Sequence, residues 1–359
     1  MDLNRLKLLG IAKDRVLCGP RYVSLCLNNY CNNRCLYCAT HSPLADKSGF
    51  KAAGMDFALA KKLIDQAAAW GSREVLITGL GEPTLHPEFK EIAGYIKRKK
   101  LMSALTTNAL FGKKEFPAVA AIDYVLVNLS APEERLYTRL QSPHDKTSFM
   151  KALVNISALV KLKKSCRSPY VTLVFVINSM NCRSVPGILA LAEKLGVHNV
   201  RFRCMEHTKE TEALLLSNKQ KLELLSIIAR ELKTSRGIRH NLEVIKSTIL
   251  DCNGVHDINH CYAGWFMMEV DFAGKVRICA DKTVIGDMKK GAIKGIWRSP
   301  EAHKMRLRLK YNLRRDKPFL GIACRLCCRR ELNLAVDDAL KQYGERGLNR
   351  TSLADILMK

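Results

Sequence analysis

Three cysteines near the start of the chain have the spacing that points most directly to chemistry. Cys31, Cys35 and Cys38 form a CxxxCxxC pattern within one polar loop. Three thiolates on one loop can hold a zinc ion or an iron–sulfur cluster. A structural zinc site takes four ligands, whereas three cysteines leave one iron of a four-iron cluster open. Because a reactive site needs an open metal position, the spacing favours a reactive cluster.

A second group of cysteines lies in the last third of the chain. Twelve residues separate Cys261 from Gly274, and four more separate Gly274 from Cys279. A hairpin that brings these two cysteines together, closed by a distant CxxC, would supply four thiolates. Four thiolates saturate a metal, as in structural zinc or a fully ligated cluster. The predicted ligands are Cys261, Cys279, Cys324 and Cys327, with Cys328 as the alternative to Cys327.

Alternating strands and helices would position the first cysteines. Apolar runs rich in β-forming residues predict strands at 22–27, 74–78, 103–107, 124–129, 170–177 and 200–203. Helical spacing of apolar residues predicts helices at 56–70, 87–99, 149–163, 185–195 and 219–233. This order predicts an α/β fold with a parallel sheet and helices outside it. The CxxxCxxC loop follows the first strand, at the edge where such folds carry their chemistry.

The pattern changes from about residue 254. Segments 266–270 and 275–279 flank a turn that contains Gly274, which predicts a β-hairpin, and a helix is expected at 301–309. We therefore place a boundary near residue 250. The expected organisation is an N-terminal extension at 1–19, a core at 20–250, an auxiliary module at 251–331 and a tail at 332–359.

The motifs together resemble those of the radical S-adenosylmethionine (SAM) superfamily, over roughly residues 20 to 235. Tyr37 precedes the last cysteine, where that family usually has an aromatic residue. The segment Gly79-Leu80-Gly81-Glu82-Pro83 follows the second strand, like the GxGEP motif of the family. Asn108 ends the third strand and Ser130 the fourth. The resemblance implies a partial (β/α)6 TIM-like barrel with a small C-terminal twitch/SPASM-like β-hairpin module.

The resemblance also implies a cofactor and a reaction. In that family, the open iron of a 4Fe–4S cluster binds SAM, whose reductive cleavage gives a 5′-deoxyadenosyl radical that abstracts hydrogen from the substrate. The implied contacts are Gly79, Gly81, Glu82 and Pro83 at the methionine amino group, Ser130 at the carboxylate or ribose, and Tyr37 near the adenine. Asn108, Arg139 and Asn178 are further candidates for polar contacts in the same pocket.

The second group of cysteines resembles the SPASM and twitch extensions of the same superfamily. The Cys-x12-Gly-x4-Cys spacing opens a SPASM domain, but the longer cysteine series of a full SPASM domain is absent from this sequence. The twitch type, which holds one auxiliary 4Fe–4S cluster, is therefore the closer resemblance. From the residues alone, structural zinc stays the alternative.

Composition and charge limit the class of protein and of partner. The chain has 359 residues, 14 cysteines and a formal net charge of +25, a balance that attracts acidic or phosphorylated partners. The basic segment 303–315 is expected to be a solvated face, so nucleic acid is a partner that we do not favour. No stretch predicts a membrane span or the apolar core of a signal peptide, and we expect a cytoplasmic protein.

The expected reaction follows from the auxiliary cluster. Oxidation of a substrate radical needs an electron acceptor, which a fully ligated cluster can be. We therefore expect oxidation or epimerisation of a small polar substrate such as a sugar or cyclitol, with flavodoxin or ferredoxin as electron donor. One alternative is a radical enzyme that modifies a peptide. The other is a basic nucleic-acid-binding protein with structural zinc sites.

Overall fold

One sheet organises the molecule. The computed structural model describes residues 3–45, 47–141, 145, 147–162, 169–205, 209–251, 260–278, 283–311 and 330–346. Within these residues, the sheet has the order β10-β9-β8-β1-β2-β3-β4-β5-β6-β7. The strands are β1 (Tyr22–Cys26), β2 (Glu74–Thr78), β3 (Met102–Thr107), β4 (Tyr124–Asn128), β5 (Tyr170–Ile177), β6 (Asn199–Cys204), β7 (Arg239–His240), β8 (Met267–Val270), β9 (Lys275–Arg277) and β10 (Gly286–Asp287).

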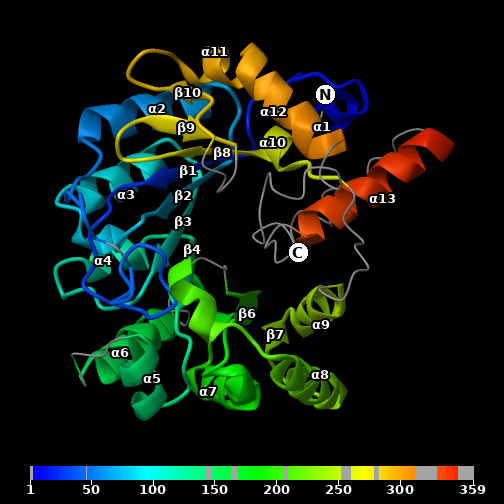
Figure 1. The fold of residues 1–359 in the computed structure, drawn as a ribbon. Helices are drawn as coiled ribbons and strands as arrows, with labels where there is room; N and C mark the ends of the chain where they lie inside the picture. Colours follow the sequence, from blue (N-terminus) through cyan, green and yellow to red (C-terminus); the bar gives the residue numbers. More distant parts are fainter. Residues whose placement is uncertain are drawn as a thin grey trace.

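Helices cover the outer face of this curved sheet, as Figure 1 shows for α2, α3, α6, α7 and α8. The helices are α1 (Leu3–Ala12), α2 (Phe57–Ala69), α3 (Phe89–Arg98), α4 (Phe116–Ala120), α5 (Glu134–Leu140), α6 (Ser148–Lys161), α7 (Val185–Leu195), α8 (Asn218–Lys233), α9 (Leu242–Asp251), α10 (Ala263–Phe266), α11 (Ile293–Trp297), α12 (Pro300–Tyr311) and α13 (Arg330–Arg346). No helix in this described part of the chain is long and apolar enough to cross a membrane.

The two faces of the sheet differ because side chains alternate along a strand. On β2, Val75 and Ile77 are buried in the main hydrophobic core, whereas Leu76 and Thr78 are only partly buried. The same alternation holds on β4, where Val125 is buried in that core. On these two strands the outer face is therefore closed by helices, and the inner face keeps partly buried groups.

The expected fold class is confirmed. The six predicted strands are β1 to β6, and β1 to β7 pair in parallel in chain order. The predicted helix ends also fit local chemistry. Asp56 precedes α2 and its Oδ1 accepts a hydrogen bond from the Leu59 amide at 2.7 Å, which makes it an N-cap.

The C-terminal hairpin joins the same sheet instead of forming a separate one. β8 pairs in parallel with β1, from Tyr22 opposite Met267 to Leu25 opposite Val270, and β9 pairs antiparallel with β8. The hairpin was predicted from the turn residues, but its pairing with β1 was not. The domain boundaries that we predict near residue 250 stay a prediction.

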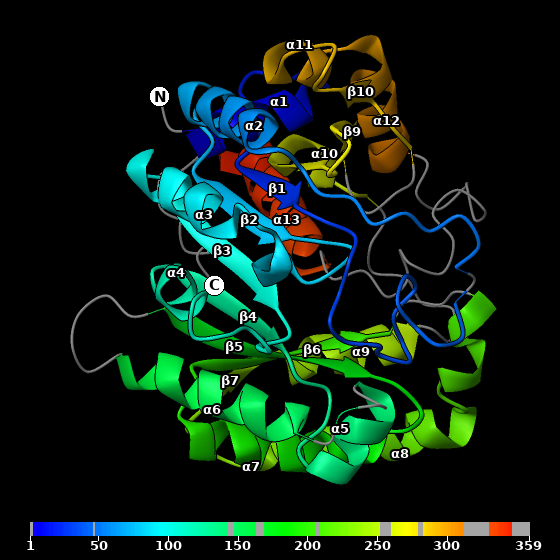
Figure 2. The same ribbon diagram turned by 90° about the vertical axis from the view of Figure 1, so that its left-hand side faces the viewer.

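The two ends of the described chain share a small core. Leu8 and Ile11 of α1 pack with Trp265 and Phe266 of α10 and with Val336 of α13. Figures 1 and 2 both show α1 beside α10, and α13 also contacts α1. We call this cluster the terminal core. The segments expected as an extension and as a tail therefore pack together.

The expectation of a solvated basic face on 303–315 is wrong for two residues of α12. Arg306 is fully buried, with its guanidinium 4.2 Å from the Trp297 ring centroid and its Nε donating to the Gly264 carbonyl at 2.6 Å. Lys310 is 8% exposed and its Nζ donates to the Ile11 carbonyl at 2.6 Å. One Nε bond and the Trp297 ring hold the Arg306 guanidinium, and the Ile11 carbonyl and the Asp14 carboxylate hold the Lys310 ammonium. Composition alone does not reveal these contacts.

Candidate functional site

The loop that carries the first three cysteines follows β1 and is fixed by the end of α5. We call residues 28–42 the cysteine loop. The Leu36 amide donates to the Leu140 carbonyl at 2.9 Å, and the Arg34 amide donates to the Gln141 carbonyl at 3.3 Å. Within the loop, the Cys38 amide donates to the Cys35 carbonyl at 3.0 Å. The three cysteine positions are therefore set by backbone contacts to a neighbouring helix.

The sulfur atoms of this loop meet hydrogen-bond donors. The His41 amide lies 3.2 Å from the Cys38 Sγ, and the Asn108 Nδ2 lies 3.9 Å from the Cys31 Sγ. Donors of this kind stabilise thiolates and tune the potential of a cluster that they hold. Burial raises the pKa of the Cys31 thiol to about 12 and raises the pKa of Cys35 as well. Metal binding at these thiols must therefore displace protons.

Several buried polar atoms around the loop have no hydrogen-bond partner. They are Asn28 Oδ1, Asn33 Nδ2, His41 Nε2 and the Tyr137 hydroxyl. Buried polar groups are normally paired, and three of these atoms belong to the cysteine loop itself, which fits a bound group that carries polar atoms. In the described residues, no three His, Cys, Asp or Glu side chains converge on one ion. A cubic cluster takes each thiolate on a different iron, so three thiols and these polar atoms fit such a cluster with a polar ligand.

The Gly79–Pro83 segment lies directly against the cysteine loop. The Glu82 amide donates to the Tyr30 carbonyl at 2.9 Å, and the Gly81 amide donates to the Asn28 carbonyl at 3.2 Å. A Cβ atom on Gly81 would overlap the backbone of Tyr30. Only glycine permits this approach, which is a stronger reason for the residue than turn formation alone.

Glu82 joins the ends of two strands. Its side chain is 2% exposed, and its Oε1 accepts from the Thr84 and Thr107 hydroxyls, each at 2.7 Å. Its Oε2 accepts from the Asn108 amide at 2.7 Å. Burial is the largest influence on this carboxyl and raises its pKa. The side chain of Glu82 therefore ties the end of β2 to the end of β3, and the backbone of the segment is what can line a ligand.

Ser130 connects the cysteine loop to β5. Its Oγ accepts from the Tyr37 hydroxyl at 2.9 Å and from the Val176 amide at 3.0 Å. Its amide donates to the Gln141 Oε1 at 2.6 Å. Burial raises the pKa of Tyr37 well above its usual value, so the phenol stays protonated and acts as the donor. The structure thus brings two of the predicted SAM contacts into direct hydrogen bonding.

The remaining predicted contacts differ in their surroundings. Asn108 adjoins the loop, since its Nδ2 also donates to the Asn32 Oδ1 at 2.7 Å. Asn178 is buried, but its Oδ1 accepts from the Met180 amide at 3.0 Å and its Nδ2 donates to the Val176 carbonyl at 3.2 Å. Its side chain is therefore used within its own turn. Arg139 lies exposed on α5.

Two residues that the sequence did not single out hold the site together. Gln141 accepts from the Ser130 amide and donates from its Nε2 to the Asn128 carbonyl at 3.1 Å. Asn181 donates from its Nδ2 to the Ser130 carbonyl at 2.9 Å. Neither belongs to a recognisable motif, so no sequence signal marks them.

The second cysteine group is described only at its first member. Cys261 is buried, and its amide donates to the Leu309 carbonyl of α12 at 3.1 Å. Cys279, Cys324, Cys327 and Cys328 lie outside the described residues. The predicted ligand set of the auxiliary cluster therefore stays a prediction.

Two family models match the chain. Residues 25–177 match the radical SAM superfamily, and residues 261–329 match SPASM, an iron–sulfur cluster-binding domain. The first match contains the cysteine loop and the Gly79–Pro83 segment, and the second begins at Cys261 and contains the other predicted cluster ligands. The two domains imply a 4Fe–4S cluster and an auxiliary cluster.

Two known proteins with different names are similar to this chain in sequence. Fe-coproporphyrin III synthase of Methanosarcina barkeri is 26% identical to this chain. The match covers 48% of this chain and 41% of the length of that protein. PqqA peptide cyclase of Xanthomonas campestris is 22% identical over 88% of this chain and 81% of its own length.

Solved structures share the fold. SuiB of Streptococcus suis, in complex with S-adenosylmethionine, superposes with a TM-score of 0.63 at 14% identity, over 84% of this chain and 71% of its own. Native anSMEcpe with bound AdoMet gives a TM-score of 0.62 at 16% identity, over 88% and 91% of the two chains.

Proposed function

Because this chain belongs to the radical SAM superfamily and carries a SPASM domain, we propose that it modifies a peptide by radical chemistry. The observation that carries the proposal is the match to PqqA peptide cyclase, which runs through both domains over 88% of the chain. SuiB has been solved with its precursor peptide SuiA, and anSMEcpe with a peptide as well. A peptide substrate therefore fits better than the sugar or cyclitol expected at first, which these relatives do not support.

The geometry of the site supports radical chemistry at the carboxyl ends of β1 to β4. When bound, a cluster on Cys31, Cys35 and Cys38 supplies the electron that cleaves SAM and so begins hydrogen abstraction. The Gly79–Pro83 backbone and Ser130 lie against the same loop, where they would hold the methionine and ribose of SAM. Asn108 and Gln141 keep these segments in register with the loop.

The accessory parts of the function are proposals of the same kind. Cys261, Cys279, Cys324 and Cys327 would hold the auxiliary cluster. A flavodoxin or ferredoxin would deliver electrons, and the enzyme would work in the cytoplasm, where thiols stay reduced.

The first experiment measures metal and SAM cleavage together. The protein is purified without oxygen, reconstituted with iron and sulfide, and incubated with SAM and a reductant, and 5′-deoxyadenosine is then quantified. The test variant carries Cys31→Ala, Cys35→Ala and Cys38→Ala. The control carries Cys182→Ala, which replaces a buried cysteine in the short turn after β5. We expect product from the wild type and the control, and none from the test variant, which keeps about four irons.

The second experiment tests the substrate. Peptides encoded beside the gene are co-expressed with the wild type or with the test variant, and their masses are compared. A mass change that requires the intact cysteine loop supports the proposal, whereas activity only on sugars would overturn it. Zinc in place of iron, with SAM left intact, would instead favour the basic nucleic-acid-binding alternative.

A further inference from the structure

A buried hydroxyl beside the cysteine loop has no hydrogen-bond partner among the described residues. Tyr137 of α5 is 0% exposed, and its ring packs against Phe149 of α6 with the centroids 5.3 Å apart. Of the four unpaired polar atoms around the loop, the Tyr137 hydroxyl is the one that lies outside the loop itself. A buried hydroxyl without a partner costs free energy, so this position calls for an acceptor.

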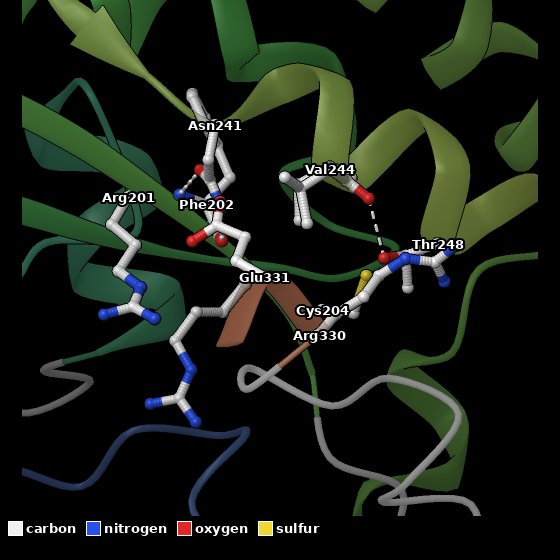
Figure 3. Close-up of a pocket in the computed structure, with 10 residues that line it drawn as sticks. Arg201, Phe202, Cys204, Asn241, Val244, Thr248, Arg330 and Glu331 are labelled. Carbon is white, nitrogen blue, oxygen red and sulfur yellow. Dashed lines mark hydrogen bonds between the residues drawn. The ribbon is translucent and has the colours of Figure 1, made fainter. Parts of the chain in front are cut away.

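Polar side chains at another edge of the barrel have partners within the protein. Figure 3 shows two of them beside β6. The Thr248 hydroxyl donates to the Val244 carbonyl at 2.7 Å. The Asn241 amide bonds the Phe202 backbone at 2.8 and 3.1 Å. Tyr137 differs from them, because its hydroxyl is a donor whose acceptor is not found in the described part of the chain.

The helix α5 places Tyr137 next to the predicted cluster ligands. The carbonyls of Leu140 and Gln141, at the end of α5, accept from two amides of the cysteine loop at 2.9 and 3.3 Å. Tyr137 lies one helical turn earlier, and its carbonyl accepts from the Gln141 amide at 2.7 Å. The turn of helix that anchors the loop therefore also carries Tyr137.

The phenol keeps its hydrogen and lies within electrostatic reach of two predicted ligands. Burial is the largest influence on the pKa of Tyr137 and raises it, and the charges of Cys35 and Cys31 raise it further. The hydroxyl is therefore a donor at neutral pH. Asn33 of the loop also has an unpaired Nδ2, but an amide nitrogen only donates, so it cannot accept the phenol hydrogen.

The sulfur atoms of an iron–sulfur cluster are acceptors that carry negative charge. Hydrogen bonds to these atoms help to set the reduction potential, because a donor stabilises the more negative, reduced form more than the oxidised form. We propose that the Tyr137 hydroxyl donates a hydrogen bond to a sulfur atom of the cluster on Cys31, Cys35 and Cys38, and so raises the reduction potential of that cluster. The proposal rests on the proposed function, because it assigns a role at the same cluster.

The reduction potential tests this bond apart from activity. The reconstituted protein is titrated with dithionite while its electron paramagnetic resonance is recorded. The signal of the first cluster is the one that is absent from the variant without the three loop cysteines. The wild type is compared with Tyr137→Phe, which removes only the hydroxyl, and with the matched control Tyr95→Phe. The Tyr95 hydroxyl donates to the Asp65 Oδ1 at 2.6 Å, between the outer helices α3 and α2.

We expect Tyr137→Phe to lower the potential of the first cluster by about 59 mV, which is a tenfold smaller ratio of reduced to oxidised cluster at a given potential. The control Tyr95→Phe should keep the potential of the wild type, because its hydroxyl lies on the outer side of the barrel. Iron content should be equal in all three proteins.

Thermal unfolding separates this role from a structural one. In the variant without the three loop cysteines, the Tyr137 hydroxyl has no cluster to bond. Adding Tyr137→Phe there removes a buried, unpaired hydroxyl, so the melting temperature should stay the same or rise. Adding Tyr95→Phe to the same variant breaks a bond that the protein makes, and should lower the melting temperature.

Two outcomes would overturn the proposal. In one, Tyr137→Phe keeps the potential of the wild type. In the other, Tyr137→Phe lowers the melting temperature as much without the loop cysteines as with them, which would show that the hydroxyl is bonded within the protein. The proposed function fails separately, when the neighbouring peptides keep their masses, because the potential is measured without peptide. A protein with no signal that depends on the loop cysteines would overturn both.

Discussion

The cysteine loop and the terminal core are held in different ways. Neutral backbone amides and carbonyls fix the cysteine loop, through partners such as Glu82, Leu140 and Gln141. Buried cations fix the terminal core, where Lys7 and Lys310 donate to backbone carbonyls of distant segments. The loop that carries the predicted cluster ligands is therefore fixed by its neighbours in the barrel, whereas the core ties the two ends of the described chain together.

The strongest way to break the cysteine loop is to add one carbon. Gly81→Ala places a Cβ within the backbone of Tyr30, so the Gly79–Pro83 segment must move away from the loop. We expect a loss of about 3 kcal/mol in the free energy of unfolding, and the loss of about half of the iron after reconstitution. Iron analysis and denaturant unfolding measure the two effects.

Gly94→Ala is the matched control for that substitution. Gly94 lies inside α3, and its added Cβ would meet only the Arg98 Nη1, at 3.4 Å. Alanine favours a helix interior by up to about 1 kcal/mol, so this variant should be as stable as the wild type or more so. Full iron content in Gly81→Ala would show that the close approach does not shape the site.

A buried cation of the terminal core gives the next largest effect. Lys310→Met removes the bonds from the Nζ to the Ile11 carbonyl and to the Asp14 Oδ1, and leaves that carbonyl with only the longer bond from the Asp14 amide, at 3.3 Å. We expect a loss of about 2 kcal/mol. Hydrogen exchange should rise in α1 and stay unchanged in β2 and β3. Lys61→Met, which breaks an exposed pair with Asp65 and a contact with the Tyr95 ring, should change neither stability nor exchange by a comparable amount. If exchange rose equally in all segments of Lys310→Met, the comparison would be contradicted.

Lys7 makes the terminal core sensitive to pH. Burial lowers its pKa to about 8, below the 10.5 of an ordinary lysine. Between these values the unfolded chain binds more protons than the folded chain, so this residue makes stability rise with pH from about 8 to about 10.5. We expect the melting temperature of the wild type to rise with pH across that range, and that of Lys7→Met to rise less or to fall. Parallel curves would mean that Lys7 keeps an ordinary pKa.

The smallest effect sharpens the role of Tyr37. Tyr37→Phe removes the donor to Ser130, whose Oγ keeps its bond from the Val176 amide. We expect a loss of about 1 kcal/mol in stability and a KM for SAM raised severalfold, with kcat little changed. Tyr124→Phe, at an exposed tyrosine, should alter neither value. A large fall in kcat would indicate that the Tyr37 hydroxyl takes part in the reaction beyond holding Ser130 in place.

Features that depend on a short motif could be predicted from the sequence, and features that depend on contacts between distant residues could not. CxxxCxxC and Gly79–Pro83 are short motifs, and the strands before them alternate with helices, so local pattern revealed both the fold class and the predicted cluster loop. Gln141 and Asn181 lie far from those motifs in the sequence and act through a few side-chain hydrogen bonds to the backbone. The burial of Arg306 depends on Trp297 and Gly264, and no local pattern records that contact.

The pairing of β8 with β1 restricts how the protein can open. A hinge between the barrel and the hairpin would break the ladder from Tyr22 to Leu25 and leave its amides without partners. The hairpin therefore moves with the barrel as one body. At the other end of the sheet, β7 pairs with β6 through only two residue pairs, so that edge of the sheet is held by fewer backbone bonds than the ladder between β1 and β8.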